Sequence, residues 1–575
     1  MNSYEQHQIQ NGGHGYEPPP VQIAGQACLS CKKQKRKCDK ALPACALCNR
    51  MNRACDYSDA APTPTSDDFN ALKMKVMQLE SSLHGRHQPP TSYTPSSSNA
   101  LVEAANLGQQ MQPIYNPAQE ISWQVVQNRF PAIAFLDGQT FRYGGVVVPK
   151  PNVEIPGDVL QLLGDANEIQ DIVTKYFDTV HKWMPIVSHK RMTRNLANPL
   201  WEGGPDLGLL FLCMKLITST PPDGIEATQS SLYTSAKRFI ALLEATGSAS
   251  LHLLQANLLV TWYEYGQAIY PAAFMSAGWC VRYGNMLGIN GNEEAVELLG
   301  RTDIWVEQEE RRRTWWGVLL ADRIICIGSQ KYIQNSQEPS SEDILPSPGY
   351  IWESGENTAA EQRKVGMPLD VAVDPFQRLC QVYSLLGAVI DHHYGKKLQE
   401  EQDQFTFATQ LYSELTSLII KITEESNNDP IVIASPLALA YSTLCRLCDR
   451  YCRPSPRPGA SMPATTAASE MQTQAIEGLR GVASMIKEFA NQVSAVTPQP
   501  QDLDRTSPII MDALYSAAAH FAWMVRESGD ETCQNALDTL RNTMRKLSVR
   551  WRSAAEYLRL LEAQEFTYAV GSAGS

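Results

Sequence analysis

Apolar residues recur every three to four positions through most of the chain from residue 159 onward, which is typical of amphipathic helices. The pattern is sustained in residues 471–493, 508–525 and 531–565. The last of these segments carries a broad apolar face made of Leu540, Met544, Leu547, Trp551, Tyr557 and Leu558. No sustained alternation of apolar and polar residues, the pattern of a half-buried strand, interrupts it. The sequence therefore predicts a large all-α domain over residues 121–565, which begins with an irregular lead-in.

A second, shorter helical pattern lies in residues 69–85. Its apolar residues are separated by 3, 4, 3 and 4 positions, as in the a/d seam of a coiled coil, and they are Phe69, Leu72, Val76, Leu79 and Leu83. Residues 66–68 offer helix N-caps and Gly85 offers a stop. We expect a short coiled coil that pairs two copies of the chain. Two heptads are too short to hold a dimer alone, and a lone amphipathic helix packed on the large domain is the alternative.

Polar stretches separate these elements. Gly, Pro, Gln, Ser and Thr predominate in them and apolar periodicity is absent, which is typical of flexible segments. The sequence predicts a disordered start at residues 1–25, a linker at 58–68, a disordered linker at 86–120, a low-complexity loop at 453–470 and a flexible tail at 566–575.

Chain length and the distribution of charge support a division of the chain into separate domains. At 575 residues the chain is too long for one compact domain. Its net charge is −12, yet five of the six residues 32–37 are Lys or Arg. A basic patch on an acidic chain indicates a dedicated DNA-contacting module with a separate body. The most apolar stretch, residues 507–525, is interrupted by Asp512 and His520, so we expect no membrane span, and the N-terminus has no secretory signal core.

The candidate metal site lies in residues 28–55, which hold six of the fourteen cysteines in the spacing C-x2-C-x6-C-x6-C-x2-C-x6-C. The candidate ligands are Cys28, Cys31, Cys38, Cys45, Cys48 and Cys55. Two zinc ions with four thiolates each need eight ligands, and six suffice if two cysteines bridge both ions. The two halves repeat each other, and we expect each to form a small helix-and-strand unit. A disulfide framework and a one-zinc site with spare thiols are the alternatives, although scattered cysteines elsewhere favour a reducing compartment.

The basic run itself predicts a short helix over residues 32–37, since it contains good helix formers and neither Gly nor Pro. So small a unit must take its folding free energy from the metal. A helix held between zinc ligands can enter the major groove of double-stranded DNA, where Lys or Arg bonds guanine O6 and N7. A nuclear import signal or a set of solvated lysines is the alternative interpretation.

The six cysteines, Pro43 in the loop that joins the halves, and the basic run resemble the fungal Zn2Cys6 (zinc binuclear cluster) transcription factors. The resemblance implies two Zn²⁺ ions, with Cys28 and Cys45 as the bridging pair. It also implies that Lys35, three positions before the third cysteine, reads bases in CGG-type half-sites. The other basic residues of the run would contact mainly phosphates, and they are Lys32, Lys33, Arg36 and Lys37. Gln34 departs from the family pattern, in which this position is often basic.

Three further stretches, residues 176–192, 253–290 and 309–329, resemble the regulatory region of the same family, the fungal-specific or middle homology domain. The likeness is good over residues 156–350 and fades toward residue 565. It departs after Ser329, where many relatives have a Gly-Arg-Pro-like turn and this chain has Gln330, Lys331 and Tyr332.

Within this body we expect structural roles for residues that could suggest other sites. Arg311 and Arg313 should pair with Glu307 and Glu309 four positions earlier rather than contact DNA. The apolar residues that follow on the same helix should be core, and they are Trp316, Leu319, Leu320, Ile324 and Ile327. We expect His181 to be packed rather than metal-bound. We also expect Cys445, Cys448 and Cys452 to be buried thiols, because no fourth zinc ligand lies nearby in sequence.

No catalytic sequence motif is present, so we expect no enzyme. The sequence predicts a nuclear, sequence-specific DNA-binding transcription factor of the RNA polymerase II type that acts as a homodimer. Its helical body would respond to a small-molecule effector, to co-regulators or the transcription machinery, or to intramolecular contacts. A metabolic or secondary-metabolite gene set is a reasonable target. The alternatives are a chromatin or nucleic-acid scaffold without sequence specificity and, less favoured, an enzyme with an unrecognised site.

Overall fold

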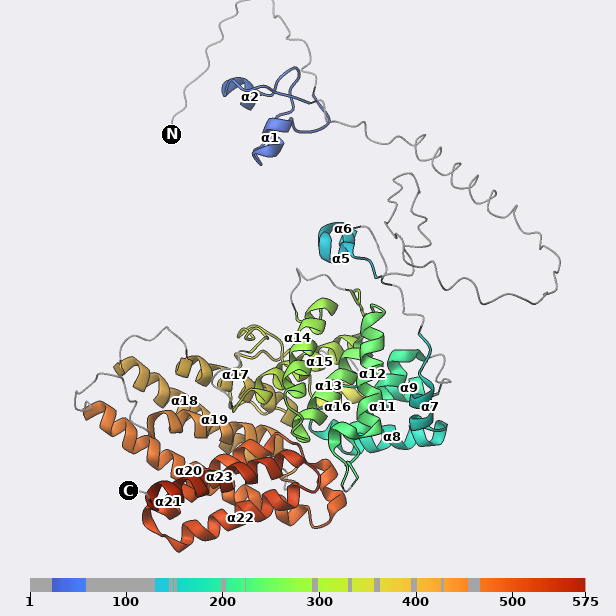
Figure 1. Ribbon diagram of the computed structural model, residues 1–575. Helices are drawn as coiled ribbons and strands as arrows, with labels where there is room; N and C mark the ends of the chain where they lie inside the picture. The colour runs from blue at the N-terminus through green and yellow to red at the C-terminus, as the bar shows by residue number, and fades with distance from the viewer. Residues whose placement is uncertain are drawn as a thin grey trace, which may run out of the picture. The chain divides into compact units, whose positions relative to one another are not determined.

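The structure is a computed structural model of the chain, and it divides into two units, Met1–Tyr115 and Asn116–Ser575, which are considered separately (Figure 1). The described residues are 23–57, 130–143, 148, 153–197, 203–222, 224–291, 298–328, 334–355, 362–394, 401–425, 429–452 and 466–573. The predicted seam at residues 69–85 and the predicted linkers at 58–68 and 86–120 lie outside these residues.

The small unit consists of two five-residue helices, α1 (Leu29–Lys33) and α2 (Ala46–Arg50), each of which begins directly after a cysteine. The helices repeat each other in detail. Their N-cap cysteines have nearly equal backbone angles, φ −62° and ψ 154° at Cys28 and φ −67° and ψ 149° at Cys45. Each is followed by a non-glycine residue in the left-handed region, with φ 49° at Lys35 and 48° at Asn52. The predicted repeat of the two halves is therefore present at the level of the backbone.

Two details of the predicted unit are wrong. The first helix does not span residues 32–37, because α1 begins at Leu29 and ends at Lys33. The left-handed turn at Lys35 ends it, because the backbone amide of Arg36 then donates to the carbonyl of Cys31 (3.0 Å). The expected strand is also absent among residues 23–57, where only an isolated antiparallel bridge joins Ile23 to Ala41.

The described residues of the larger unit form α-helices and three short 3-10 helices, which confirms the predicted all-α class. No strand occurs among its described residues, where one isolated bridge joins Ile344 and Lys364. The helices of its first part are α5 (Ile133–Leu136), α6 (Gly138–Tyr143), α7 (Gly157–Leu163), α8 (Ala166–Asp178), η1 (Val180–Lys182), α9 (His189–Leu196), α11 (Pro205–Ile217), η2 (Ala227–Gln229), α12 (Ser231–Ala245), α13 (Leu251–Gly266), α14 (Ala272–Leu287) and α15 (Trp305–Ile325). Those of its second part are α16 (Gly349–Ser354), α17 (Pro375–Tyr394), α18 (Glu401–Glu424), α19 (Ala434–Cys452), α20 (Thr466–Val496), η3 (Pro500–Arg505), α21 (Ile510–Ser528), α22 (Glu531–Leu547) and α23 (Arg552–Ala573).

Two helices form the centre of the first part. Helices α11 and α13 are apolar on nearly all sides, and such helices are buried rather than amphipathic. They pack against each other, and α13 also packs against α14 and α15. In the second part α19 has the corresponding place, packed against α17, α18, α20 and α21 (Figure 1). One continuous apolar core runs through both parts of the body.

The predicted C-terminal helix over residues 531–565 is wrong in one respect, because it is two helices, α22 and α23, separated at Ser548–Trp551. The break lets Arg550 and Trp551 leave the helical register and enter the core. The indole of Trp551 donates to the carbonyl of Thr506 (3.0 Å), and Arg550 donates to the carbonyl of Ile217. Helical periodicity continues across the break, so the sequence pattern does not reveal it.

Other predicted boundaries shift by a few residues. Helix α20 begins at Thr466, inside the predicted loop at 453–470. Helix α23 continues to Ala573, inside the predicted tail at 566–575. The irregular lead-in contains the short helices α5 and α6. Among the residues that the structure places, none of the helices combines the length and the apolar character needed to cross a membrane.

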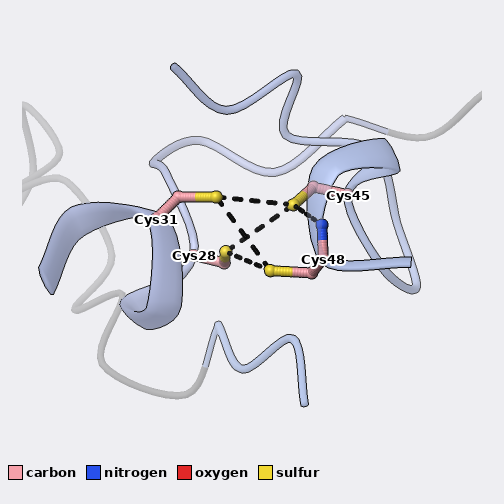
Figure 2. A group of neighbouring side chains, drawn as sticks. All are labelled: Cys28, Cys31, Cys45 and Cys48. Atoms are coloured by element: carbon pink, nitrogen blue, oxygen red, sulfur yellow. Dashed lines mark hydrogen bonds between the residues drawn. The ribbon is translucent and has the colours of Figure 1, made fainter. Parts of the chain in front are cut away.

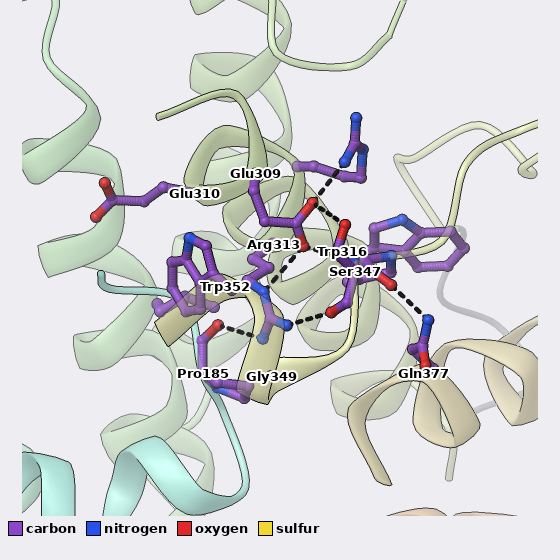
Figure 3. A network of polar contacts seen from close by, with 12 residues as sticks. Pro185, Glu309, Glu310, Arg313, Trp316, Ser347, Gly349, Trp352 and Gln377 are labelled. Atoms are coloured by element: carbon purple, nitrogen blue, oxygen red, sulfur yellow. Dashed lines mark hydrogen bonds and ion pairs between the residues drawn. The ribbon is translucent and has the colours of Figure 1, made fainter. Parts of the chain in front are cut away.

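The expected ion pairs on α15 are confirmed, and one of them is deeply buried. Arg311 lies 2.7 Å from Glu307, and Arg313 lies 3.0 Å from Glu309. The side chains of Arg313 and Glu309 are 1% and 0% exposed. Figure 3 shows the Arg313 guanidinium between Glu309 and the carbonyls of Pro185 and Ser347, to which it donates at 3.4 and 2.5 Å. This residue therefore joins α15 to two loops rather than forming a surface pair.

The remaining structural expectations for the body hold, except for the predicted burial of Cys452. The predicted core residues of α15 are buried, from Trp316 to Ile324, and so is Ile327, which lies two residues beyond the end of the helix. His181 is 5% exposed, and burial lowers its pKa to about 4, so the ring is neutral near pH 7. Cys445 and Cys448 are buried, whereas Cys452 is half-buried. No potential metal-ligand group is found around these three thiols within the described part of the chain.

Candidate metal centre and DNA-binding surface

Four thiols meet between the first turns of α1 and α2. The sulfur atoms of Cys28, Cys31, Cys45 and Cys48 all lie within 4.8 Å of one another, and the four residues are buried (Figure 2). The distances between the two helices are 3.8 Å for Cys28–Cys45, 3.6 Å for Cys28–Cys48, 3.7 Å for Cys31–Cys45 and 4.0 Å for Cys31–Cys48. A zinc ion with four sulfur ligands at about 2.3 Å has an S–S edge of about 3.8 Å. The thiol spacing therefore fits tetrahedral zinc.

The other two cysteines lie at the edge of this group and are half-buried. Cys38 Sγ, Cys45 Sγ and an Asp39 carboxylate oxygen lie within 4.8 Å of one another. Cys55 Sγ accepts a hydrogen bond from the backbone amide of Cys45 (3.2 Å). The six predicted ligands are thus gathered in one cluster, with Cys38 and Cys55 each beside Cys45.

Zinc uptake at this cluster requires loss of thiol protons. Burial among the other thiols raises the pKa of Cys28 to about 12 and raises that of Cys45 further. Only the thiolate is a zinc ligand, so the metal must displace these protons. In the zinc-bound unit, Cys28 and Cys45 would be held as thiolates, and the metal centre would supply the core around which the unit folds.

Two residues that the sequence analysis did not single out support the cluster. The carboxylate of Asp39 accepts from the backbone amide of Ala46, at 3.1 Å to each oxygen, and so caps the start of α2. Tyr57 donates to the carbonyl of Ala41 (3.1 Å), and its hydroxyl lies 3.9 Å from Cys38 Sγ. Neither position has a sequence signal, because both contacts cross between the two halves of the unit. A hydrogen bond from Ser30 Oγ to the carbonyl of Ala54 (2.9 Å) joins the halves on the other side.

The two halves share a backbone but differ in charge. The six residues between the second and third cysteine of the first half, 32–37, contain five basic residues, and all six are exposed. The corresponding residues of the second half, 49–54, contain two, Arg50 and Arg53. The positive charge needed to approach phosphates is therefore concentrated on one half of a nearly symmetric unit.

Lys35 lies at the turn that ends α1, two residues beyond its last residue, and it is exposed. Its backbone amide donates to the carbonyl of Lys32 (3.2 Å), so a hydrogen-bonded turn fixes the position of its Cα. Beside it, the amide oxygen of Gln34 accepts from Arg53 Nη1 (2.5 Å). This contact occupies the position where the family pattern favours a basic residue.

Comparisons with known proteins agree with these observations. Residues 26–64 match the family model described as the fungal Zn(2)-Cys(6) binuclear cluster domain. Residues 173–427 match the fungal specific transcription factor domain. The first match shows that the six cysteines form a binuclear cluster, which binds two zinc ions.

Three curated relatives illustrate the likeness. Transcription factor BOA15 of Botryotinia fuckeliana is 40% identical over 182 residues, which are 31% of this chain and 97% of the relative. The pigment biosynthesis transcriptional activator pigB of Monascus ruber is 23% identical over 566 residues, 95% of each chain. The citrinin biosynthesis transcriptional activator ctnR of Monascus purpureus is 21% identical over 382 residues, 61% of each chain.

Proposed function

Because the chain belongs to the fungal Zn2Cys6 transcription factors, we propose that its zinc cluster reads CGG-type half-sites in double-stranded DNA through Lys35. The observation that carries the proposal is the charge difference between the two halves. Both halves have a five-residue helix after an N-cap cysteine and a left-handed turn, yet only the first has a strongly basic loop. The first half is thus the one suited to face DNA.

Roles within the basic loop follow from position. Lys35 extends from the turn at the end of α1, where a five-residue helix can bring one side chain to a base edge in the major groove. Its ammonium group would donate to guanine O6 and N7. We propose that the neighbouring basic residues contact phosphates and thereby orient the unit, and these are Lys32, Lys33, Arg36 and Lys37.

We also propose that Cys28 and Cys45 bridge the two zinc ions. Each is the first cysteine of its half, is the N-cap of its helix and is 0% exposed. Cys45 lies near sulfur atoms of both halves, and its backbone amide contacts Cys55. A ligand shared by two ions has to occupy such a central place.

Replacing Lys35 with alanine should weaken binding to a CGG half-site by about 1–3 kcal/mol, or about 5- to 150-fold, and should reduce discrimination against other bases. Electrophoretic mobility shift with matched and mutated sites measures both quantities. The matched control is Asn52→Ala, which changes the equivalent left-handed turn in the second half. If Asn52→Ala reduces discrimination as much as Lys35→Ala, the assignment of the reading half is wrong.

Lys33→Ala separates base reading from phosphate contact in the same assay. We expect it to weaken binding to all sequences alike and to reduce the slope of log K against log salt by about 0.9, since one phosphate contact is lost. A selective loss at one base pair would instead make Lys33 a base-reading residue. Equal affinity of the unchanged protein for CGG sites and scrambled DNA would support a scaffold without sequence specificity and contradict the proposal.

We further propose that the seam formed by Phe69, Leu72, Val76, Leu79 and Leu83 pairs two chains, a proposal that rests on sequence alone. Charged residues at two seam positions, Leu72→Asp with Leu79→Asp, should convert a dimer into a monomer in sedimentation equilibrium. The control is Gln78→Asp, one position before a seam residue and off the seam, which should leave the dimer intact. A double variant that still sediments as a dimer would place the dimer contact elsewhere.

The names of the relatives describe regulators of pigment and citrinin biosynthesis. We propose that this chain acts in the nucleus, together with co-regulators or the transcription machinery, on a metabolic or secondary-metabolite biosynthetic gene set. We also propose that it acts by binding DNA rather than by catalysis, and that a small-molecule effector acts on its body. Transcript profiling of a deletion strain tests the gene set, and unchanged transcripts of all biosynthetic gene clusters would contradict it.

A further inference from the structure

A large cavity lies among the C-terminal helices of the body, α19 to α23, which are coloured orange to red in Figure 1. Its volume is about 1030 Å³, at the upper end of the range of about 300–1,000 Å³ that small-molecule sites occupy. Trp523 lines it and is 40% exposed, so the cavity reaches the surface there. Its size therefore admits a molecule of several fused rings.

Apolar and aromatic side chains make up much of the lining. Leu479 comes from α20, Leu537 from α22, and Leu560 from α23. The rings of Tyr515 and Tyr557 are stacked, with centroids 4.9 Å apart. The ring of Trp523 lies 5.8 Å from that of His520. Flat aromatic molecules pack well against such surfaces.

The charged side chains of the lining are largely neutralised within the protein. Arg446 of α19 lies 2.8 Å from Asp512 of α21, and Arg541 of α22 pairs with Glu565 of α23. The two other charged residues of the lining, Asp449 and Arg526, are of opposite sign, so the lining carries little net charge for an ion to balance. A ligand of this cavity is therefore uncharged, because an ion would lose its hydration without gaining a counter-charge.

Three buried polar atoms in the lining have no hydrogen-bond partner in the described part of the chain. The donor among them is Arg446 Nε, and the other two are Asp512 Oδ2, on a residue that is 4% exposed, and His520 Nε2, on a residue that is 7% exposed. Asp512 Oδ1 is already bonded to Arg446, which fixes the carboxylate. Burial lowers the pKa of His520 to about 4, so its ring is neutral near pH 7 and can accept a hydrogen bond. An unsatisfied buried acceptor costs about 1–3 kcal/mol, which a ligand hydroxyl can recover after a small rotation of the side chain.

From these observations we propose that the cavity lined by Asp512, His520 and Trp523 binds an uncharged, hydroxylated aromatic molecule. The hydroxyl donates to the unpartnered Nε2 of His520 on α21, and the fused rings lie against Trp523 and the leucines. This proposal rests on the proposed function, in which a small-molecule effector acts on the body, and it names the class of that effector. Binding itself involves only the helical body.

The test uses the full-length, zinc-loaded chain and two probes that differ by a single group, 2-acetyl-6-hydroxynaphthalene and 2-acetylnaphthalene. Isothermal titration calorimetry should give one site per chain for the hydroxylated probe and weaker binding for the other. His520→Leu should weaken the hydroxylated probe about 3- to 10-fold, as loss of one hydrogen bond predicts, and leave the other probe unchanged.

The second variant fills the cavity with a larger side chain. Ala519, on α21, lines the cavity and is half-buried, so Ala519→Phe should weaken both probes more than about tenfold. The control is Ala241→Phe on the exposed face of α12, which should change neither. Equal binding of the two probes, no effect of Ala519→Phe, or no one-to-one binding at all would each overturn the proposal. Binding of the same samples to a CGG site is measured in parallel, so failure of the cavity is distinguishable from failure of the DNA-binding proposal.

Discussion

Cys45→Ala is expected to unfold the zinc unit and to reduce specific DNA binding by more than about 100-fold. Cys45 is the N-cap of α2, is fully buried, and lies within 3.8 Å of the sulfur atoms of Cys28 and Cys31. As the proposed ligand of both ions it cannot be lost without weakening each of them. Structural zinc contributes about 10–16 kcal/mol to the folding of so small a unit, which has no other core. Metal analysis should therefore find fewer than two zinc ions per chain, and a mobility shift should find no specific complex.

Two further variants make this result specific. Cys55→Ala removes a half-buried thiol at the edge of the cluster and should retain one zinc ion, because only one ion loses a ligand. Cys452→Ala removes a half-buried thiol of the body and should retain two. A Cys45→Ala protein that still held two zinc ions per chain would show that Cys45 does not bridge them.

Arg313→Ala should destabilise the helical body by about 3–5 kcal/mol, since it leaves the buried carboxylate of Glu309 without its fully buried counter-charge. The guanidinium also lies 4.3 Å from the centre of the Trp352 ring and donates to two loop carbonyls. At about 2.1 cal/mol/K per residue, this loss corresponds to a decrease of about 3–5 °C in the melting temperature of a body of this size. Differential scanning calorimetry of the full chain measures it.

The matched control is the preceding residue. Arg312 bonds the other oxygen of the same carboxylate, at 2.5 Å, but its side chain is 23% exposed. A partly exposed pair contributes about 0–1 kcal/mol, so Arg312→Ala should lower the melting temperature by about 1 °C or less. Equal effects of the two variants would mean that burial of the Arg313 guanidinium contributes nothing beyond an ordinary surface pair.

The six-cysteine zinc cluster could be predicted because its information is local, whereas the supporting contacts of Asp39 and Tyr57 could not. Six cysteines at fixed spacing leave few ways to bind zinc, and the repeat of the two halves is visible in their order. The position of α1 could not be predicted, since helix propensity favours residues 32–37 equally throughout. The left-handed turn at Lys35 ends the helix instead, and no glycine marks it.

In the body the helices were predictable and their contacts were not. Pairing between Glu309 and Arg313 follows from their spacing of four residues on one helix. Their burial does not, because it depends on the loop at Ser347 and on Pro185, which is 128 residues away from Arg313. The break between α22 and α23 has the same origin, since the partners of Arg550 and Trp551 belong to distant segments.

The contact between Arg550 and the carbonyl of Ile217 can form only late in the synthesis of the chain. The two residues are 333 positions apart. At about 5–20 residues per second, a ribosome needs roughly 20–70 s to add that length of chain. Throughout this interval the end of α11 lacks its partner, and its carbonyls stay open to solvent or to chaperones. The core of the body can therefore close only after the C-terminal helices have been synthesised.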